Sequence, residues 1–199
     1  MSQELEYSAN LTGASFLLYE FKQVVSLKEQ GLEDSDIKVR VLTENLFQYQ
    51  VKASLKRSLP TVLRRVKVLD DTLRKMVLEE SLDTCKIINL YAIMKTDRLF
   101  FEFMNEVIRE KLETDNYMFE KKDLNVFIAS KAEQDAGVAS WMEQTVNKLK
   151  QVFVKVLYES GLLKDKKTGE LSRLLMDEQL EQHLIQIGDI AYLRAMGEV

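Results

Sequence analysis

Helix-breaking residues are scarce in this chain, because its 199 residues include only 7 glycines and 1 proline. Long helices tolerate few of either, since glycine costs backbone entropy and proline removes a hydrogen-bond donor. Apolar residues also recur at helical spacing along most of the chain. We therefore predict an all-α fold, mainly helical, with room for one short β-hairpin.

The composition indicates a folded chain in a reducing compartment. Apolar residues make up 46% of it, enough for a core, and the 30% of charged residues are mixed in sign. Cys85 is the single cysteine, so no intramolecular disulfide can form. The first residues do not show the basic-then-apolar pattern of a signal sequence, so we expect none, and no apolar run reaches the ~20 residues that span a bilayer. We expect a cytoplasmic protein with no membrane partner.

The helical periodicity fades at one polar stretch, residues 113–123, which reads ETDNYMFEKKD. Polar residues without periodicity are typical of loops and linkers. The sequence therefore predicts an N-terminal helical bundle (1–112), a linker (113–123) and a C-terminal helical domain (124–199).

Three successive helical patterns open the first half. The first begins directly after Thr12, a candidate N-cap, and the third is basic, as in a helix-turn-helix unit. The third pattern is VKASLKRSLPTVLRRVKVL, residues 51–69. Pro60 is compatible with a kink in one long helix or with the first turn of a new helix capped by Ser58. We favour a new helix at this point.

The second half contains a candidate winged helix. A helical pattern runs to Gly161, and LLKDKKTGELSRLLMD follows. Its polar turn lies between apolar pairs and includes Gly169, which predicts a hairpin. Lys164, Lys166 and Lys167 would then lie on the wing, where a wing contacts phosphates.

Catalytic and metal-binding signals are weak. His183 is the only histidine, so it and Cys85 cannot assemble the usual transition-metal clusters. The chain has no phosphate-binding glycine loop and no calcium-binding loop motif. We predict a protein that is not an enzyme, with no catalytic residue, metal, cofactor or small-molecule substrate.

Positive charge is concentrated in a chain whose formal net charge is -4. Residues 37–67 hold eight basic residues and one acid, Glu44. At 100° per residue, five of the bases in residues 51–69 fall within an arc of about 140°, and Arg65 lies apart. Two readings stay open, because this face could meet nucleic acid or the acids that follow it in sequence, Asp70, Asp71, Glu79 and Glu80.

Three stretches resemble the BrxA family of BREX bacteriophage-resistance systems. They are YSANLTGASFLLYEF, KRSLPTVLRRVKVLD and INLYAIMKTDRLFFEFMNEVIREKL. The resemblance spans nearly the whole chain. It implies two small helical bundles with some likeness to the RNA-binding factor NusB, double-stranded DNA binding, and other BREX proteins as partners.

The resemblance supplies no catalytic motif, so the candidate DNA-binding residues come from the charge pattern. They are Lys52, Lys56, Arg57, Arg64, Arg65, Lys67, Lys164, Lys166 and Lys167. Two other functions compete with DNA binding. One is a protein-interaction module that docks another BREX subunit, and the other is an RNA-binding module with a NusB-like fold.

Overall fold

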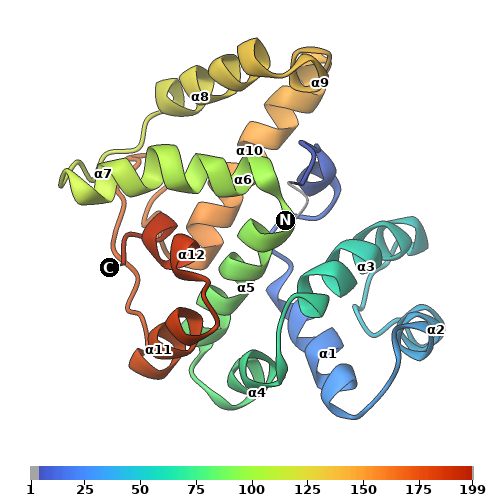
Figure 1. Ribbon diagram of the computed structural model, residues 1–199. Coiled ribbons are helices and arrows are strands. Elements are labelled where there is room, and N and C mark those ends of the chain that lie inside the picture. The colour runs from blue at the N-terminus through green and yellow to red at the C-terminus, as the bar shows by residue number, and fades with distance from the viewer. Residues whose placement is uncertain (1–4, 199) are drawn as a thin grey trace.

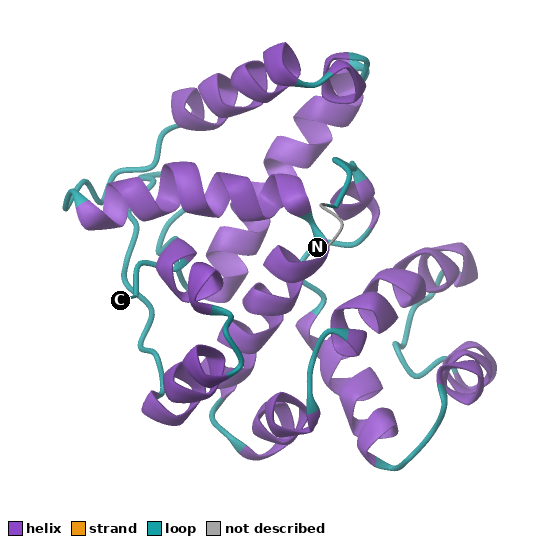
Figure 2. Ribbon diagram, in the orientation of Figure 1, coloured by secondary structure: helices purple, strands orange, loops and turns teal. Residues whose placement is uncertain are grey.

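The computed structural model describes residues 5–198, and within them the fold is all-α, as predicted (Figures 1 and 2). A 3₁₀ turn, η1 (Asn10–Gly13), precedes the helices. They are α1 (Leu18–Glu29), α2 (Asp34–Glu44), α3 (Lys52–Lys67), α4 (Asp71–Glu79), α5 (Leu82–Thr96), α6 (Arg98–Phe103), the π-helical turn η2 (Met104–Ile108), α7 (Arg109–Glu113), α8 (Lys121–Gln134), α9 (Ala136–Ala139), α10 (Glu143–Ser160), α11 (Glu178–Gln186) and α12 (Ile190–Ala195). None of these described helices has the length and apolar character needed to cross a bilayer.

Helix α5 lies at the centre of the molecule (Figure 1). Almost every residue from Thr84 to Met94 is buried, so the surrounding helices enclose α5 on nearly all sides. It packs against α3 and α4 from the first half and against α10 and α12 from the second.

The chain does not enter α1 where the sequence predicts. The periodic pattern favours a helix directly after Thr12, but α1 begins at Leu18. Between them, the carbonyls of residues 14–16 accept hydrogen bonds from the buried side chains of Arg65 and Asn89. Leu17 then adopts the left-handed conformation, with φ of 51°. Tertiary hydrogen bonds therefore replace the first helical turn.

Helix α3 runs without interruption through Pro60, so the predicted new helix at this point is wrong. Ser58 does not cap a helix. It is buried, and its hydroxyl donates to the carbonyl of Leu55 at 3.2 Å. Proline removes one backbone hydrogen bond, whereas apolar residues on both sides of Pro60 are buried against the bundle. Burial of both halves on one surface outweighs the missing bond.

The core does not divide at residues 113–123. Phe119 is buried, and its N–H donates to the carbonyl of Gly169 at 2.8 Å. Phe103 of α6 contacts Phe127 of α8 and Phe153 of α10, at ring-centroid distances of 5.5 and 5.2 Å. Buried apolar residues from Leu11 to Met196 form one cluster. The predicted division into two independently folding units stays a prediction, and one shared core argues against it.

The last two helices are fixed to the middle of the chain by polar contacts. The Tyr91 hydroxyl of α5 donates to Asp189, just before α12, and Lys95 pairs with the same carboxylate. His183 Nε2 of α11 lies 2.7 Å from Oδ2 of Asp70, the residue before α4. The C-terminal segment therefore closes over residues that precede it by about half the chain.

Candidate nucleic-acid interface

Helix α3 separates its apolar residues from its basic ones. Leu55, Leu59, Val62 and Val66 are buried against the neighbouring helices. Five basic side chains on the other side are exposed, and we call them the α3 basic face: Lys52, Lys56, Arg57, Arg64 and Lys67. The buried stripe anchors the helix, so the charges are presented from a fixed scaffold.

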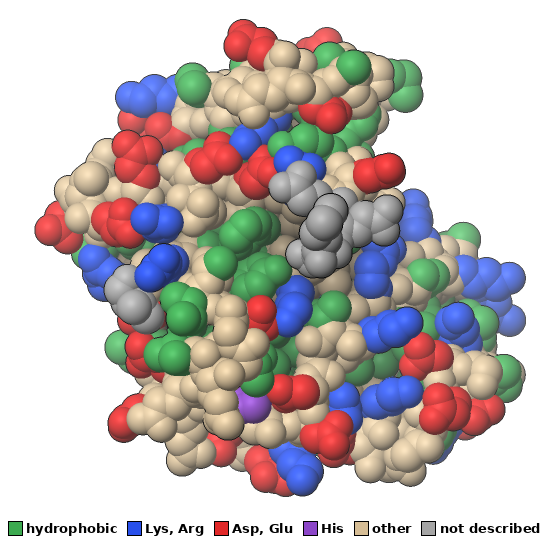
Figure 3. Space-filling model, viewed as in Figure 1, with side chains coloured by type: hydrophobic (Ala, Val, Ile, Leu, Met, Phe, Trp, Pro, Cys, Tyr) green, Lys and Arg blue, Asp and Glu red, His purple; other side chains and the backbone are tan. Residues whose placement is uncertain are grey.

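Within residues 5–198, no residue of the α3 basic face forms an ion pair. Figure 3 shows Lys and Arg side chains gathered over this part of the surface, at the right of the view. Charges of one sign repel each other unless something opposite meets them. The positive charges of the α3 basic face are therefore available to attract an anionic partner.

The acids that follow α3 do not neutralise it. Asp70 accepts the Leu73 N–H at the start of α4 and also contacts His183. Asp71 pairs with Arg74 inside α4. Among the described residues, neither Glu79 nor Glu80 pairs with a base of α3. An intramolecular role for the basic face was the main alternative to a binding role, and the geometry does not provide it.

Arg65 does not belong to this surface, and its prediction as a DNA-binding residue is corrected here. Its side chain is 0% exposed. The guanidinium donates to the carbonyls of Phe16, Ala14 and Ser15 at 2.8, 2.8 and 2.7 Å. Burial lowers the pKa of Arg65 to about 9, so it stays charged at neutral pH. Its separate position on the helical wheel was the signal that it faces inward.

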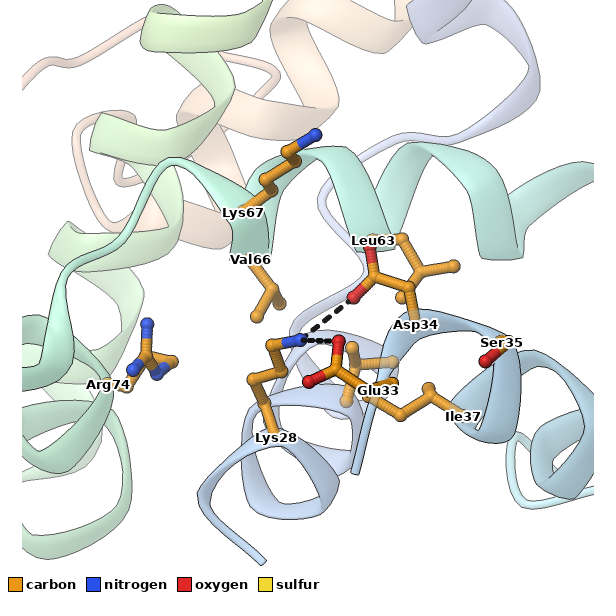
Figure 4. A pocket seen from close by; sticks show the side chains of 10 residues that line it. Lys28, Glu33, Asp34, Ser35, Ile37, Leu63, Val66, Lys67 and Arg74 are labelled. Atoms are coloured by element: carbon orange, nitrogen blue, oxygen red, sulfur yellow. Dashed lines mark hydrogen bonds and ion pairs between the residues drawn. The ribbon is translucent and has the colours of Figure 1, made fainter. Parts of the chain in front are cut away.

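A pocket of about 420 Å³ opens beside the C-terminal end of the basic face, between α1, α2, α3 and α4 (Figure 4). Every charged residue that lines it except Lys67 has an ion-pair partner among the described residues. Lys28 contacts Asp34 at 3.1 Å and Glu33 at 3.8 Å, and Arg74 contacts Glu29 at 2.7 Å. Lys67 points away from this group in Figure 4. These ion pairs link α1 to the start of α2 and to α4, while Lys67 remains available at the surface.

The predicted wing is a short turn fixed to the protein. Leu163 and Leu171 form an antiparallel bridge, as expected for a small hairpin. A third segment joins it, because Leu171 N–H donates to the Tyr117 carbonyl at 2.9 Å. The pairing stops at isolated bridges, and whether this turn acts as a wing on nucleic acid stays a prediction.

Two of the three lysines of the turn are less free than those of α3. Lys164 pairs with Glu170 at 2.7 Å, and Lys166 Nζ lies 4.3 Å from the centre of the Tyr158 ring. The backbone N–H of Lys167 is bonded to the Asp165 carboxylate, and its side chain is exposed. In Figure 1, α3 lies at the right and the loop after α10 at the left, so the two lysine sets lie apart.

Cys85 and His183, residue types that often act in catalytic or metal sites, have structural contacts in this protein. Cys85 is fully buried, and burial raises the pKa of its thiol. His183 bonds the Asp70 carboxylate. In the part of the chain that the structure describes, no group of three histidine, cysteine or acidic side chains could hold a metal ion.

The comparisons with known proteins agree with one another. A family model described as BrxA matches residues 5–188. A protein of Bacillus cereus (strain H3081.97) described as "BREX protein BrxA" is 37% identical over 194 residues, 97% of each chain. A protein of Paramagnetospirillum magneticum (strain ATCC 700264 / AMB-1) with the same description is 22% identical over 181 residues, 91% of each chain.

A solved structure shares the fold. It is the crystal structure of an uncharacterized protein from Magnetospirillum magneticum, which superimposes with a TM-score of 0.82 at 22% sequence identity. The match covers 96% of this chain and 98% of that one. The arrangement of helices is therefore retained across a large divergence in sequence.

Proposed function

This chain belongs to the BrxA family, and from that premise we propose that it is a non-catalytic, double-stranded DNA-binding component of a BREX phage-defence system. The observation that carries the proposal is the α3 basic face, with its five exposed bases and no ion pair among the described residues. The other proteins of the same system are its proposed partners.

The mode of binding follows from the chemistry of the face. Lysine and arginine on a fixed helix meet phosphates and release counterions, which favours binding that depends little on base sequence. Because these side chains are exposed on a well-anchored helix, they can reach DNA phosphates without any unfolding of the bundle. The turn around Lys167 is a second candidate contact, weakened by the Lys164–Glu170 pair.

The test is a gel-shift series on duplex DNA, single-stranded DNA and RNA at several salt concentrations. We expect duplex DNA to bind, with an affinity that falls steeply as salt rises. Alanine at Lys52, Lys56 and Lys67 should weaken binding to unrelated duplexes equally. Each phosphate contact removed should flatten the log–log salt slope by about 0.9.

The matched control is alanine at Lys164, Lys166 and Lys167. If this set abolishes binding while the α3 set leaves affinity and slope unchanged, the interface lies in the second half. If neither set matters in folded protein, the charge serves a protein interface and the proposal is wrong. Structured RNA that outcompetes duplex DNA would support the RNA-binding alternative.

A further inference from the structure

A second basic surface lies away from α3, in a groove between α8, α10 and the turn after α10, which we call the α8–α10 groove. Its volume is about 600 Å³. Phe119, Leu124 and Val154 provide an apolar floor. Its rim is polar, with three lysines and three amides: Lys121, Lys150, Lys166, Asn125, Asn147 and Gln151.

The charge of this groove is unbalanced. Its lining residues, all within the described part of the chain, include no carboxylate. Three acids that adjoin lining residues in sequence have other partners. Glu120 pairs with Lys122 at 2.6 Å, Asp123 pairs with Lys111 at 2.9 Å, and Asp165 accepts the Lys167 backbone N–H at 2.7 Å. The apolar floor suits apolar side chains of a ligand, and the positive rim without carboxylates suits acidic groups. The groove therefore fits a ligand that is both apolar and acidic.

The rim is held in place before anything binds. Lys150 Nζ of α10 donates to the side-chain oxygen of Asn125 on α8 at 2.8 Å, which ties the two helices together. Lys166 is seated over the Tyr158 ring. Its turn is fixed by the bond from Phe119 N–H to the Gly169 carbonyl. Groups already in position lose less entropy on binding.

The floor does not suit nucleic acid. Bases bind single-strand grooves by stacking on exposed aromatic faces. Phe119 is only 7% exposed, and Lys166 lies over the Tyr158 ring. Aliphatic side chains would fill the space over Leu124 and Val154 without that requirement. An amphipathic peptide laid into an apolar groove is a recurring mode of recognition.

We propose that this groove docks an acidic amphipathic segment of a partner protein. Its apolar side chains pack on Phe119, Leu124 and Val154, and its carboxylates meet Lys121, Lys150 and Lys166. The proposal is independent of DNA binding by α3, because it uses a different surface and a different ligand. The groove gives the protein a means of joining an assembly while α3 remains exposed.

The test is an array of overlapping peptides that covers this chain and the other proteins encoded with it. The labelled full-length protein is the probe, and fluorescence anisotropy then measures the affinity of each bound peptide. We expect bound segments to carry an excess of Asp and Glu with apolar residues at helical spacing. Lys121→Glu with Lys150→Glu should weaken that binding about tenfold or more, because two attractive charges become repulsive.

The control is Lys52→Glu with Lys67→Glu on α3, which should leave peptide affinity unchanged. Circular dichroism of both double variants verifies that they fold. The proposal is overturned if no segment binds, if both double variants lose affinity equally, or if only segments of this chain bind, which would make the occupant a second copy. It is also overturned if Lys121→Glu with Lys150→Glu abolishes the DNA gel-shift and spares peptide binding.

Discussion

Arg64 and Arg65 are adjacent in sequence and opposite in role. Arg64 is exposed on the α3 basic face, whereas Arg65 is buried and bonded to three backbone carbonyls. One residue of helix turns the side chain by 100°, which is enough to carry it from solvent into the core. A buried guanidinium persists only because it is hydrogen-bonded. Removing it takes the side-chain donor from the carbonyls of Ala14 and Ser15, whereas the Phe16 carbonyl keeps its bond from Asn89.

We predict that Arg65→Met lowers the free energy of unfolding by about 3 kcal/mol, because the orphaned carbonyls keep their desolvation cost. Arg64→Met, its matched control, should change stability by about 0.5 kcal/mol or less and reduce DNA affinity. Urea denaturation measures the first effect and gel-shift the second. Equal stability loss in the two variants would contradict the assignment of Arg65 to the core.

Asp97 gives the fold an unusual response to pH. Burial raises the pKa of its carboxyl from 3.8 to about 6, against the Phe100 N–H bond and the attraction of Arg65. The folded state then holds the proton more tightly than the unfolded state, so this residue's contribution to stability falls as pH rises from 3.8 to about 6. We predict that Asp97→Asn, which keeps the capping oxygen, removes this fall in urea denaturation across that range.

Asp70 serves as a control for Asp97, because its pKa is shifted in the opposite direction. Partial burial alone would raise its pKa, but hydrogen bonds from Leu73 N–H and His183 outweigh it and hold the pKa below 3.8. Its stabilising contribution is therefore present at neutral pH and is lost as the medium becomes acidic. Asp70→Asn should flatten the acid side of the stability curve and leave the Asp97 window intact. Identical curves for the wild type and both variants would refute both assignments.

At the scale of elements, the turn after α10 depends on one glycine. Gly169 has φ of +78°, and a Cβ there would lie 2.0 Å from the carbonyl oxygen of Phe119. The same pair forms the hydrogen bond that holds the turn against residues 117–119. The absence of a side chain at Gly169 therefore permits the contact that holds the turn, with its Lys166, beside Phe119 of the α8–α10 groove.

Gly169→Ala should destabilise the protein by about 2 kcal/mol or more, since it combines left-handed strain with a clash against backbone. Gly188→Ala is the matched control, because Gly188 has φ of +84° and a Cβ added there would meet nothing within 4 Å. It should cost only the backbone strain, about 1 kcal/mol. Thermal unfolding of the two variants isolates the clash, and equal losses would show that none exists.

At the scale of the whole molecule, the two halves share one core. Phe103, Phe127 and Phe153 join α6, α8 and α10, and α5 contacts helices from both halves. Exposing the apolar surface of either half would expose part of the other. Such coupling is the usual basis of a single cooperative transition.

We predict one unfolding transition in urea. Trp141, the only tryptophan, lies between α9 and α10 and reports on the second half, while far-ultraviolet circular dichroism reports on all helices. The two signals should coincide. Protease should cut the exposed residues 113–116 without releasing two separately folded pieces. Two resolved transitions would support the predicted division at residues 113–123.

The sequence by itself determined the helical class, the amphipathic character of α3 and the members of its basic face, because each depends on local spacing and composition. The family resemblance likewise came from local stretches and agrees with the match over residues 5–188. These properties need no knowledge of which helices meet.

The tertiary structure decided what long-range contacts control. Arg65 is a core residue because carbonyls some fifty residues away accept its hydrogen bonds. Helix α3 continues through Pro60 because both of its halves are buried on one surface. The turn that carries Lys166 is held beside Phe119 by a hydrogen bond to Gly169, fifty residues further along the chain. The local spacing of residues does not predict such contacts, because their free energy comes from partners that are distant in sequence and meet only in the folded chain.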